Sequence, residues 1–271
     1  MSISEKFIDI REVIRKKNPS LAAMMPGFVV SFMKRLIHED EVNRIIYDYR
    51  ERYGLAFVRS VLEDMKVTYS MEGMEHIPVD HRYIFASNHP LGGFDGLVLM
   101  DAIGTVFPEI RFIVNDLLLN LKNFDPVFVP VNKHGRQSAD YARKIDETYA
   151  SDAQVLYFPA GLCSRKIKGQ ITDPKWNKNF IQKAIQYKRD VVPIYFEGRN
   201  SNFFYNVANL RKKLRIKANI EMTFLVDELF KQKGRHLCLK FGAPISYTTF
   251  DKSKDYNHWT EVVREKAYAL R

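Results

Sequence analysis

The spacing of apolar positions changes at residue 67. Beyond it, short runs rich in Val, Ile, Phe and Leu are separated by turn residues, which is typical of buried strands. The predicted strands span residues 67–71, 83–87, 110–114, 127–131, 154–158, 191–196, 220–225 and 237–241. The predicted helices between them span residues 96–103, 137–149, 177–187 and 207–214. Strands that alternate with helices predict an α/β fold with a mainly parallel central sheet flanked by helices.

Residues 1–66 have no such alternation and predict helices instead. Their longest apolar stretch, residues 21–33, is shorter than the roughly 20 apolar residues that cross a bilayer, and Pro26 interrupts it. With the basic pair that follows, residues 21–37 are equally typical of a core helix and of a helix lying in a membrane interface. We therefore predict a helical N-terminal segment attached to one α/β domain, residues 67–271.

The composition excludes several classes of protein. The chain has 271 residues and is 46% hydrophobic, which excludes a mainly disordered polyelectrolyte. Two cysteines supply neither a disulfide framework nor a four-cysteine zinc site, and they fit a reducing compartment. The first residues include acidic side chains and no apolar core, so we expect no signal peptide.

The formal net charge of +10 is concentrated in one segment. Residues 163–217 hold 14 Lys and Arg against three acidic residues, so the rest of the chain is close to neutral. A patch of this kind favours an anionic partner, which can be a nucleic acid, an acidic lipid surface or an acidic substrate.

A histidine and an aspartate lie in the loop after the predicted strand 83–87. His89 leaves the strand and Asp95 follows at the start of the next predicted helix, with Gly92 and Gly93 between them. An imidazole can accept a proton near neutral pH, while a carboxylate on its other nitrogen holds it in the required tautomer. The alternative is that Asp95 caps the helix and His89 is a buried hydrogen-bonding residue.

Three other strand ends bring glycines and basic residues to the same edge of the predicted sheet. The loops are N-K-H-G-R at 132–136, P-A-G-L-C-S-R-K at 159–166 and E-G-R at 197–199. Ligands of open α/β sheets bind outside the carboxyl ends of the strands. Arginines and free backbone N–H groups near a proton-accepting histidine suit an anionic substrate or a developing oxyanion.

Four sequence blocks in this order resemble the lysophospholipid acyltransferase family, which includes the bacterial 1-acylglycerol-3-phosphate acyltransferases. The blocks are N-H-P-L-G-G-F-D at 88–95, F-V-P-V-N-K-H-G-R at 128–136, F-P-A-G-L-C-S-R at 158–165 and V-V-P-I-Y-F-E-G at 191–198. The similarity extends over residues 67–245. The order and spacing of the blocks make the resemblance specific, although each block alone is loosely defined.

This chain departs from the family pattern at two blocks. Five residues separate His89 from Asp95 where the family has four, and the glycine pair between them must absorb the extra residue. In the third block Ala160, Leu162 and Cys163 stand where the family has Glu, Thr and Arg, and that Glu and Arg are associated with the glycerol-phosphate acceptor. These variants resemble the hemolysin-like branch, whose members acylate lyso-amino-acid lipids such as ornithine or glycine lipids. The acceptor then carries a hydroxyl on its first acyl chain and no phosphate.

The resemblance implies roles for these residues and partners for the protein. His89 is the general base on the acceptor hydroxyl, Asp95 orients it, and backbone N–H groups around Gly161 stabilise the oxyanion. Acyl-CoA or acyl carrier protein is the co-substrate, without an acyl-enzyme, and no cofactor or metal is expected. Residues 1–66 dock on an anionic membrane surface, so we expect a peripheral or monotopic protein at the cytoplasmic face that takes a lysolipid acceptor and binds no nucleic acid. The expected substrate-binding residues are Asn88, Gly92, Gly93, Arg136, Gly161, Ser164 and Arg165.

Three other interpretations stay open. Cys163 with His89 and Asp95 makes a thiol nucleophile possible, although an unactivated buried cysteine is usually inert and a small side chain here fills the space of a lost arginine. A serine hydrolase is less favoured, because the chain has no G-x-S-x-G motif. A non-catalytic protein that binds nucleic acid or anionic lipid is the third interpretation, since basic segments with aromatic residues suit single strands. The aromatic residues of that segment are Trp176, Tyr187, Tyr195, Phe203, Phe204 and Tyr205.

Overall fold

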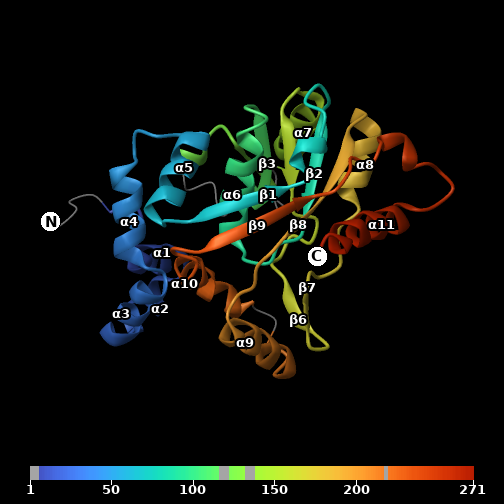
Figure 1. Cartoon of the computed structure of the whole chain (residues 1–271). Helices are drawn as coiled ribbons and strands as arrows, with labels where there is room; N and C mark the ends of the chain where they lie inside the picture. The colour runs from blue at the N-terminus through green and yellow to red at the C-terminus, as the bar shows by residue number, and fades with distance from the viewer. Residues whose placement is uncertain (1–5, 116–121, 132–137, 217–218) are drawn as a thin grey trace.

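The structure, a computed structural model, describes residues 6–115, 122–131, 138–216 and 219–271. Within them a seven-stranded sheet, in the order β1-β9-β8-β2-β5-β3-β4, crosses the molecule (Figure 1). The strands from β8 to β4 are mutually parallel, while β9 runs antiparallel to β8 and parallel to β1. The strands are β1 (Thr68–Glu72), β2 (Tyr83–Ser87), β3 (Ile110–Asn115), β4 (Phe128–Val131), β5 (Gln154–Tyr157), β8 (Asp190–Phe196) and β9 (His236–Phe241). The predicted α/β fold with a mainly parallel sheet is confirmed.

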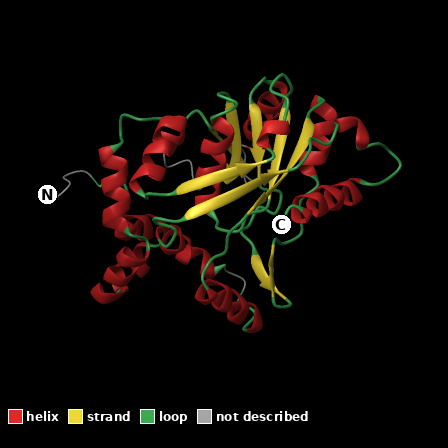
Figure 2. Cartoon of the chain, in the orientation of Figure 1, coloured by secondary structure: helices red, strands yellow, loops and turns green. Residues whose placement is uncertain are grey.

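Helices cover both faces of this sheet (Figure 2). Successive side chains of a strand point to opposite faces, so in β2 Phe85 joins one apolar cluster and Ile84 joins the other. The helices of the first cluster are α5 (Gly54–Asp64) and α6 (Gly93–Gly104), and those of the second are α7 (Ser138–Ala150), α8 (Asn179–Tyr187) and α11 (Tyr256–Ala269). Two separately packed faces hold the strand ends in fixed positions.

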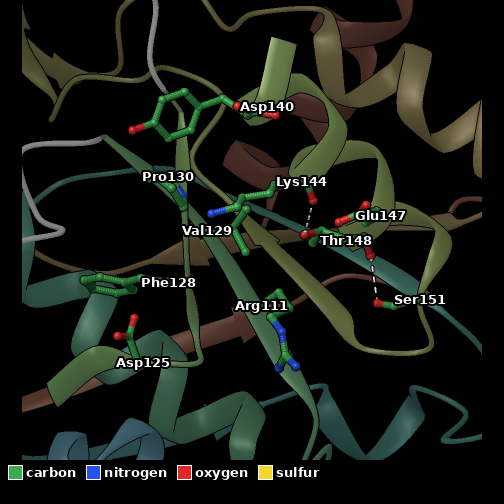
Figure 3. A pocket seen from close by; sticks show the side chains of 11 residues that line it. Arg111, Asp125, Phe128, Val129, Pro130, Asp140, Lys144, Glu147, Thr148 and Ser151 are labelled. Carbon is green, nitrogen blue, oxygen red and sulfur yellow. Dashed lines mark hydrogen bonds between the residues drawn. The ribbon is translucent and has the colours of Figure 1, made fainter. Parts of the chain in front are cut away.

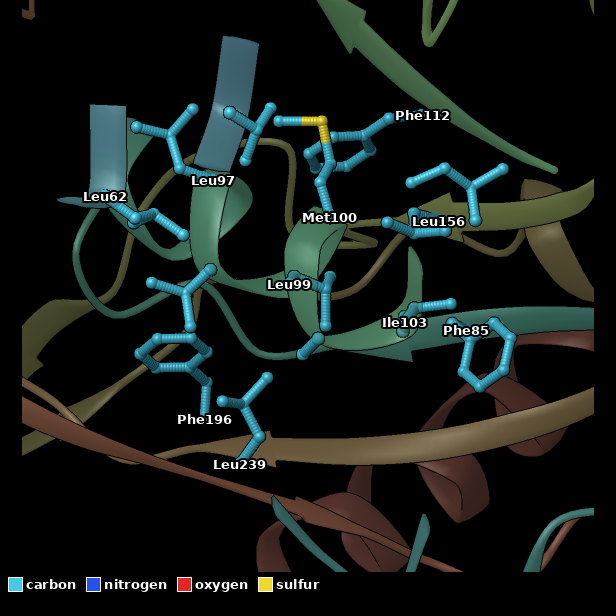
Figure 4. Packing of buried hydrophobic residues seen from close by; sticks show 14 of the residues in the cluster. Leu62, Phe85, Leu97, Leu99, Met100, Ile103, Phe112, Leu156, Phe196 and Leu239 are labelled. Carbon is cyan, nitrogen blue, oxygen red and sulfur yellow. The ribbon is translucent and has the colours of Figure 1, made fainter. Parts of the chain in front are cut away.

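Helix α6 is the most deeply buried of these helices, and it carries the aspartate predicted to orient the base. Its residues Leu99 and Ile103 lie in one cluster with Phe85 of β2 and Leu156 of β5 (Figure 4). Ten of its residues are buried. Because the helix is anchored on all sides, the residues of its first turn are held rigidly against the end of β2.

The N-terminal residues form the predicted helices. They are α1 (Ile10–Lys17), α2 (Pro19–Met24), α3 (Gly27–Leu36) and α4 (Glu39–Asp48), followed by α5. Two buried side chains of α4 hold the start of the chain: Glu39 accepts from Ile10 N and forms an ion pair with Lys34 Nζ, and Asn43 Oδ1 accepts from Phe7 N. No helix in the described part of the chain is both long and apolar enough to cross a membrane.

One predicted strand is wrong. Residues 220–225 form the short 3-10 helix η4 (Ile220–Phe224), which leads into α10 (Leu225–Phe230). The apolar run that predicts a strand here is not buried as a strand would be: Glu221 is buried because it pairs with two arginines, while Ile220 is 42% exposed.

Three elements were missed or underestimated by the sequence pattern. A two-stranded hairpin, β6 (Arg165–Ile167) with β7 (Gln170–Thr172), is too short to show an apolar period. Helix α11 begins after Asp255, whose side chain accepts from His258 N. Helix α9 (Asn202–Lys213) starts five residues before the predicted helix 207–214, because Ser201 caps it through Phe204 N.

Candidate active site

The structure brings His89 and Asp95 into direct contact. His89 Nδ1 lies 3.0 Å from Asp95 Oδ2, and the carboxylate is fully buried while the imidazole is partly exposed. Among the residues the structure describes, none forms a hydrogen bond with His89 Nε2. One ring nitrogen is therefore held by a carboxylate, while the other is available to a substrate hydroxyl, which is the arrangement that a general base requires.

Asp95 is held in place by the first turn of α6. Its Oδ2 also accepts from Leu91 N at 2.9 Å, and its Oδ1 accepts from Gly96 N at 2.9 Å. A carboxylate in the first turn of a helix is further stabilised by the helix dipole. The alternative in which Asp95 is only the helix cap is wrong, because the cap position belongs to Gly92 and the Asp95 carboxylate contacts the histidine.

The residue added between His89 and Asp95 is accommodated by Gly92. Its φ is +80°, in the region that favours glycine, and a Cβ there would lie 2.9 Å from a methyl group of Leu225 in α10. The neighbouring Gly93 begins α6, and its Cα faces open space. The longer loop therefore closes the same contact between base and carboxylate.

The backbone and ring of His89 are fixed by residues from three other segments. Its ring stacks on Phe158, with 4.0 Å between the centroids. Its carbonyl accepts from Ser164 N at 2.7 Å, and its N–H donates to Asp173 Oδ1 at 3.2 Å. Of the predicted substrate-binding residues, Ser164 thus lies against the base through its backbone, and its hydroxyl donates to Asp173 at 2.5 Å.

Asp173 is a residue of this site that the sequence analysis did not identify. It is buried, and its second oxygen accepts from Trp176 Nε1 at 2.9 Å. Burial raises the pKa of the Asp173 carboxyl, although the hydrogen bonds from Ser164 and Trp176 act in the opposite direction. The available signal was an acidic residue three positions before a tryptophan inside a strongly basic segment, where charge counting treated it as one anion among many cations.

Asn88 and Gly161 interact mainly with the protein's own backbone. Asn88 Nδ2 donates to the carbonyl of Phe196 and its Oδ1 accepts from Phe196 N at 2.6 Å, which joins the ends of β2 and β8. Gly161, with φ of +63°, donates its N–H to the Phe158 carbonyl at 3.0 Å. The next N–H, that of Leu162, has no acceptor among the described residues, so unlike the N–H of Gly161 it is free to donate to an oxyanion.

Arg165 lies in a buried ion-pair cluster. Its Nη2 lies 3.0 Å from Glu221 Oε1, and its Nη1 donates to the carbonyls of Cys163 and Ser164. Arg211 of α9 lies 2.8 Å from the other oxygen of the same carboxylate. The guanidinium of Arg165 is thus neutralised and enclosed rather than presented at the histidine. Arg136, the other arginine predicted to bind substrate, lies outside the described residues.

Cys163 is enclosed beside this cluster, with Arg165 Nη1 2.9 Å from its sulfur. Burial raises the pKa of the Cys163 thiol to about 11, against the opposing effect of Arg165. The side chain is therefore protonated at neutral pH and is a poor nucleophile. This disfavours the thiol-nucleophile interpretation.

We expect Cys163→Ser to retain most of the wild-type activity, because a protonated, enclosed thiol makes no covalent intermediate. The measurement is the rate of acyl transfer, together with the rate after treatment with iodoacetamide, which should leave the folded wild-type enzyme active. A loss of about 100-fold or more in a folded Cys163→Ser variant would instead indicate nucleophilic catalysis.

Fewer basic side chains reach the surface than the composition suggests. Arg165, Arg189 and Arg211 are buried. Arg189 donates to the carbonyls of Tyr149, Tyr83, Ala153 and Ser151, and burial lowers its pKa to about 10. These three arginines stabilise the interior and contribute nothing to a docking surface.

The aromatic residues of the basic segment do not form a stacking surface. Trp176, Phe204 and Tyr205 are fully buried, and of the six only Phe203 is largely exposed. Single-stranded nucleic acids bind through successive exposed rings, so the nucleic-acid interpretation loses its main support.

Two hollows lie in the described surface. The larger, of about 660 Å³, lies between β3, β4 and α7 and is lined by residues such as Arg111, Phe128 and Lys144, none of them from the His89–Asp95 loop (Figure 3). The smaller, of about 130 Å³, adjoins that loop at Asn88 and Pro90. Among the described residues, no group of three or more His, Cys, Asp or Glu side chains is placed to hold a metal ion.

Comparison with known proteins identifies close relatives. A family model described as "Acyltransferase" matches residues 12–271. A lyso-glycine lipid O-acyltransferase of Bacteroides thetaiotaomicron is 43% identical over 264 residues, which cover 97% of each chain. A protein of the same name from Phocaeicola vulgatus is 41% identical, over 97% of this chain and 95% of its own. Among solved structures, the 1-acyl-sn-glycerophosphate (LPA) acyltransferase PlsC of Thermotoga maritima aligns with 96% of this chain and 98% of its own, with a TM-score of 0.46 and 16% identity.

Proposed function

This chain belongs to the acyltransferase family, as its four sequence blocks predict, and we propose that it completes a glycine lipid by acylating the free hydroxyl of the lyso form. It is an acyltransferase that acts on lysolipids. The observation that carries the proposed mechanism is the contact between His89 and the buried Asp95.

The reaction that we propose is direct transfer. The acceptor hydroxyl donates a hydrogen bond to His89 Nε2, and its oxygen attacks the thioester carbonyl as the proton moves to the imidazole. Asp95 stabilises the imidazolium that forms. The tetrahedral oxyanion collapses, the C–S bond breaks, and the thiolate takes the proton from His89. The N–H of Leu162 is our candidate donor to the oxyanion.

An acceptor without phosphate fits the loop at residues 159–166. The positions that carry Glu and Arg in the phosphate-acylating relatives are Ala160 and Cys163 here, and the charge of Arg165 is balanced by Glu221. A phosphate placed beside this loop would lack the charge-assisted hydrogen bonds that are worth about 1.5–3 kcal/mol each. The names of the two relatives that are more than 40% identical point to the same class of acceptor.

We propose that the protein works as a peripheral or monotopic enzyme at the cytoplasmic face of a membrane, and takes its acyl group from acyl-CoA or acyl carrier protein. In support, α2 and α3 present large apolar side chains to solvent: Met24 is 81% exposed, Phe28 76% and Phe32 60%. Lys34 and Arg35 lie in the last turn of α3. Apolar side chains next to basic residues are the pattern of a helix that lies in a membrane interface.

The acceptor is tested by incubating the enzyme with a labelled acyl thioester and a panel of lysolipids. We expect lyso-glycine lipid to be acylated about 10- to 100-fold faster than lysophosphatidate, because the site offers no free arginine to the phosphate. Acyl-CoA and acyl carrier protein are compared in parallel as donors. Equal or faster acylation of lysophosphatidate would overturn the proposed acceptor.

A further inference from the structure

Helix α9 presents an apolar stripe to solvent. Positions 203, 207, 210 and 214 are separated by four, three and four residues and therefore lie on one side of the helix. Phe203 is 53% exposed, Leu210 56% and Leu214 61%. Scattered single apolar residues on a surface need no explanation, but a continuous row of large ones does. We refer to Phe203, Val207, Leu210 and Leu214 as the α9 stripe.

The stripe is distinct from the side by which α9 joins the protein. The buried residues Phe204, Ala208 and Arg211 lie about 100° around the helix, where Arg211 pairs with Glu221. A third side carries the exposed Asn206 and Asn209. The helix is thus already anchored in the protein. The stripe is an additional apolar side, on which the Phe203 ring contacts Phe224 at 5.0 Å between centroids, while Leu210 and Leu214 stay largely exposed.

Basic residues flank the end of the stripe. Lys212, Lys213 and Arg215 are exposed and form no ion pair with any residue that the structure describes. Apolar side chains bordered by unpaired cations complement an anionic lipid bilayer, whose acyl boundary takes the apolar residues and whose headgroups attract the cations. A second protein chain would need acidic groups of its own at this position, whereas anionic lipid supplies both components.

The stripe lies on the side of the molecule that carries the active site. Helix α9 follows the end of β8, and β8 is parallel to β2, whose end leads to His89. Leu225 of α10 lies beside the same loop, since a Cβ on Gly92 would be 2.9 Å from one of its methyl groups. In Figure 1, α9 and the N-terminal helices α2 and α3 project from the same side of the sheet, with α10 between them.

We propose that the α9 stripe is a second membrane-docking element, which inserts into an anionic bilayer together with α2 and α3. This inference rests on the proposed membrane association and extends it to two points of contact on either side of α10. Two such contacts orient the sheet edge toward the bilayer, so that the hydroxyl of a lipid acceptor reaches His89 without leaving the membrane.

The test compares two matched double variants of the full-length protein by flotation with vesicles of phosphatidylcholine and phosphatidylglycerol. Leu210→Ser with Leu214→Ser removes apolar area from the stripe, and Asn206→Ser with Asn209→Ser changes the polar side of the same helix. We expect the first to weaken vesicle binding about tenfold or more, and the second to leave it unchanged. Neutralising Lys212 and Lys213 should weaken binding at low salt only.

Two further measurements separate the possible failures. A Phe28→Ser/Phe32→Ser variant reports on α3, and failure of the wild type to bind vesicles would contradict membrane association as a whole. Normal binding of the Leu210→Ser/Leu214→Ser variant would overturn only the role of the stripe. A change in the oligomeric state of this variant, with vesicle binding intact, would also overturn that role. It would indicate that the stripe contacts a second copy of the chain. The acyltransferase activity of the Leu210→Ser/Leu214→Ser variant should remain normal toward acceptor dispersed in detergent, and should fall toward acceptor in vesicles.

Discussion

We expect His89→Ala to reduce acyl transfer by about 10²–10⁴-fold without unfolding the protein, because a positioned general base contributes a factor of this size. The imidazole is the group that the site is built around: Asp95 holds one ring nitrogen, Phe158 stacks on the ring, and the remaining nitrogen has no hydrogen-bonding partner among the described residues. His89 belongs to neither apolar cluster of the sheet, so we expect the alanine variant to stay folded.

The measurement is the initial rate with saturating thioester and lysolipid, and thermal unfolding reports on the fold. His81 is a matched control, since its Nδ1 lies 2.7 Å from Asp80 Oδ1, but on the exposed surface just before the amino end of β2, opposite the end that leads to His89. His81→Ala should transfer acyl groups at the wild-type rate. A His89→Ala rate within a factor of about three of wild type would contradict the assignment of the base.

The second large effect is expected at Glu221. The variant Glu221→Gln should lower the free energy of unfolding by about 3–5 kcal/mol, because it leaves the buried guanidinium groups of Arg165 and Arg211 without an anionic partner. The carboxylate joins three separate segments. Glu221 lies in η4, Arg165 at the end of the loop 159–166, and Arg211 in α9. Its loss is expected to loosen the contacts between these segments.

Urea unfolding followed by tryptophan fluorescence measures this effect. Glu147→Gln is the control, since Glu147 lies 3.4 Å from Arg143 in an exposed pair on α7 that is worth at most about 0.5 kcal/mol. An unfolding midpoint for Glu221→Gln equal to that of the wild type would show that the cluster does not stabilise the fold. Replacing Glu221, Arg165 and Arg211 together with methionine should recover much of the loss, because no unpaired charge then remains buried.

The cluster at Glu221 also explains why charge counting overestimates the basic surface. Residues 163–217 hold the whole positive excess of the chain, yet Arg165, Arg189 and Arg211 are buried. Arg189 binds backbone carbonyls, and the other two arginines share a glutamate that lies just beyond the segment. The remaining exposed cations include Lys212 and Lys213, beside the apolar stripe of α9.

The contact between His89 and Asp95 was predictable because it depends on local features. His89 and Asp95 are separated by five residues, and a strand end, a glycine turn and a helix start are all visible in the sequence between residues 83 and 96. Asp173 was not predictable in this way. It reaches the histidine from 84 positions away, and nothing in its neighbourhood distinguishes a buried acceptor of three hydrogen bonds from an exposed aspartate.

The sequence by itself determined the α/β alternation, the family and the histidine–aspartate pair, since each depends on residue spacing over a few turns of the chain. Only the tertiary structure decided which charges are available. Whether Arg165 binds a substrate or a glutamate depends on where Glu221 lies, 56 positions later, and the pattern around Glu221 had predicted a strand. The physical reason is that the energy of a charge is set by its burial and its partners in space, to which residues far apart in the chain contribute.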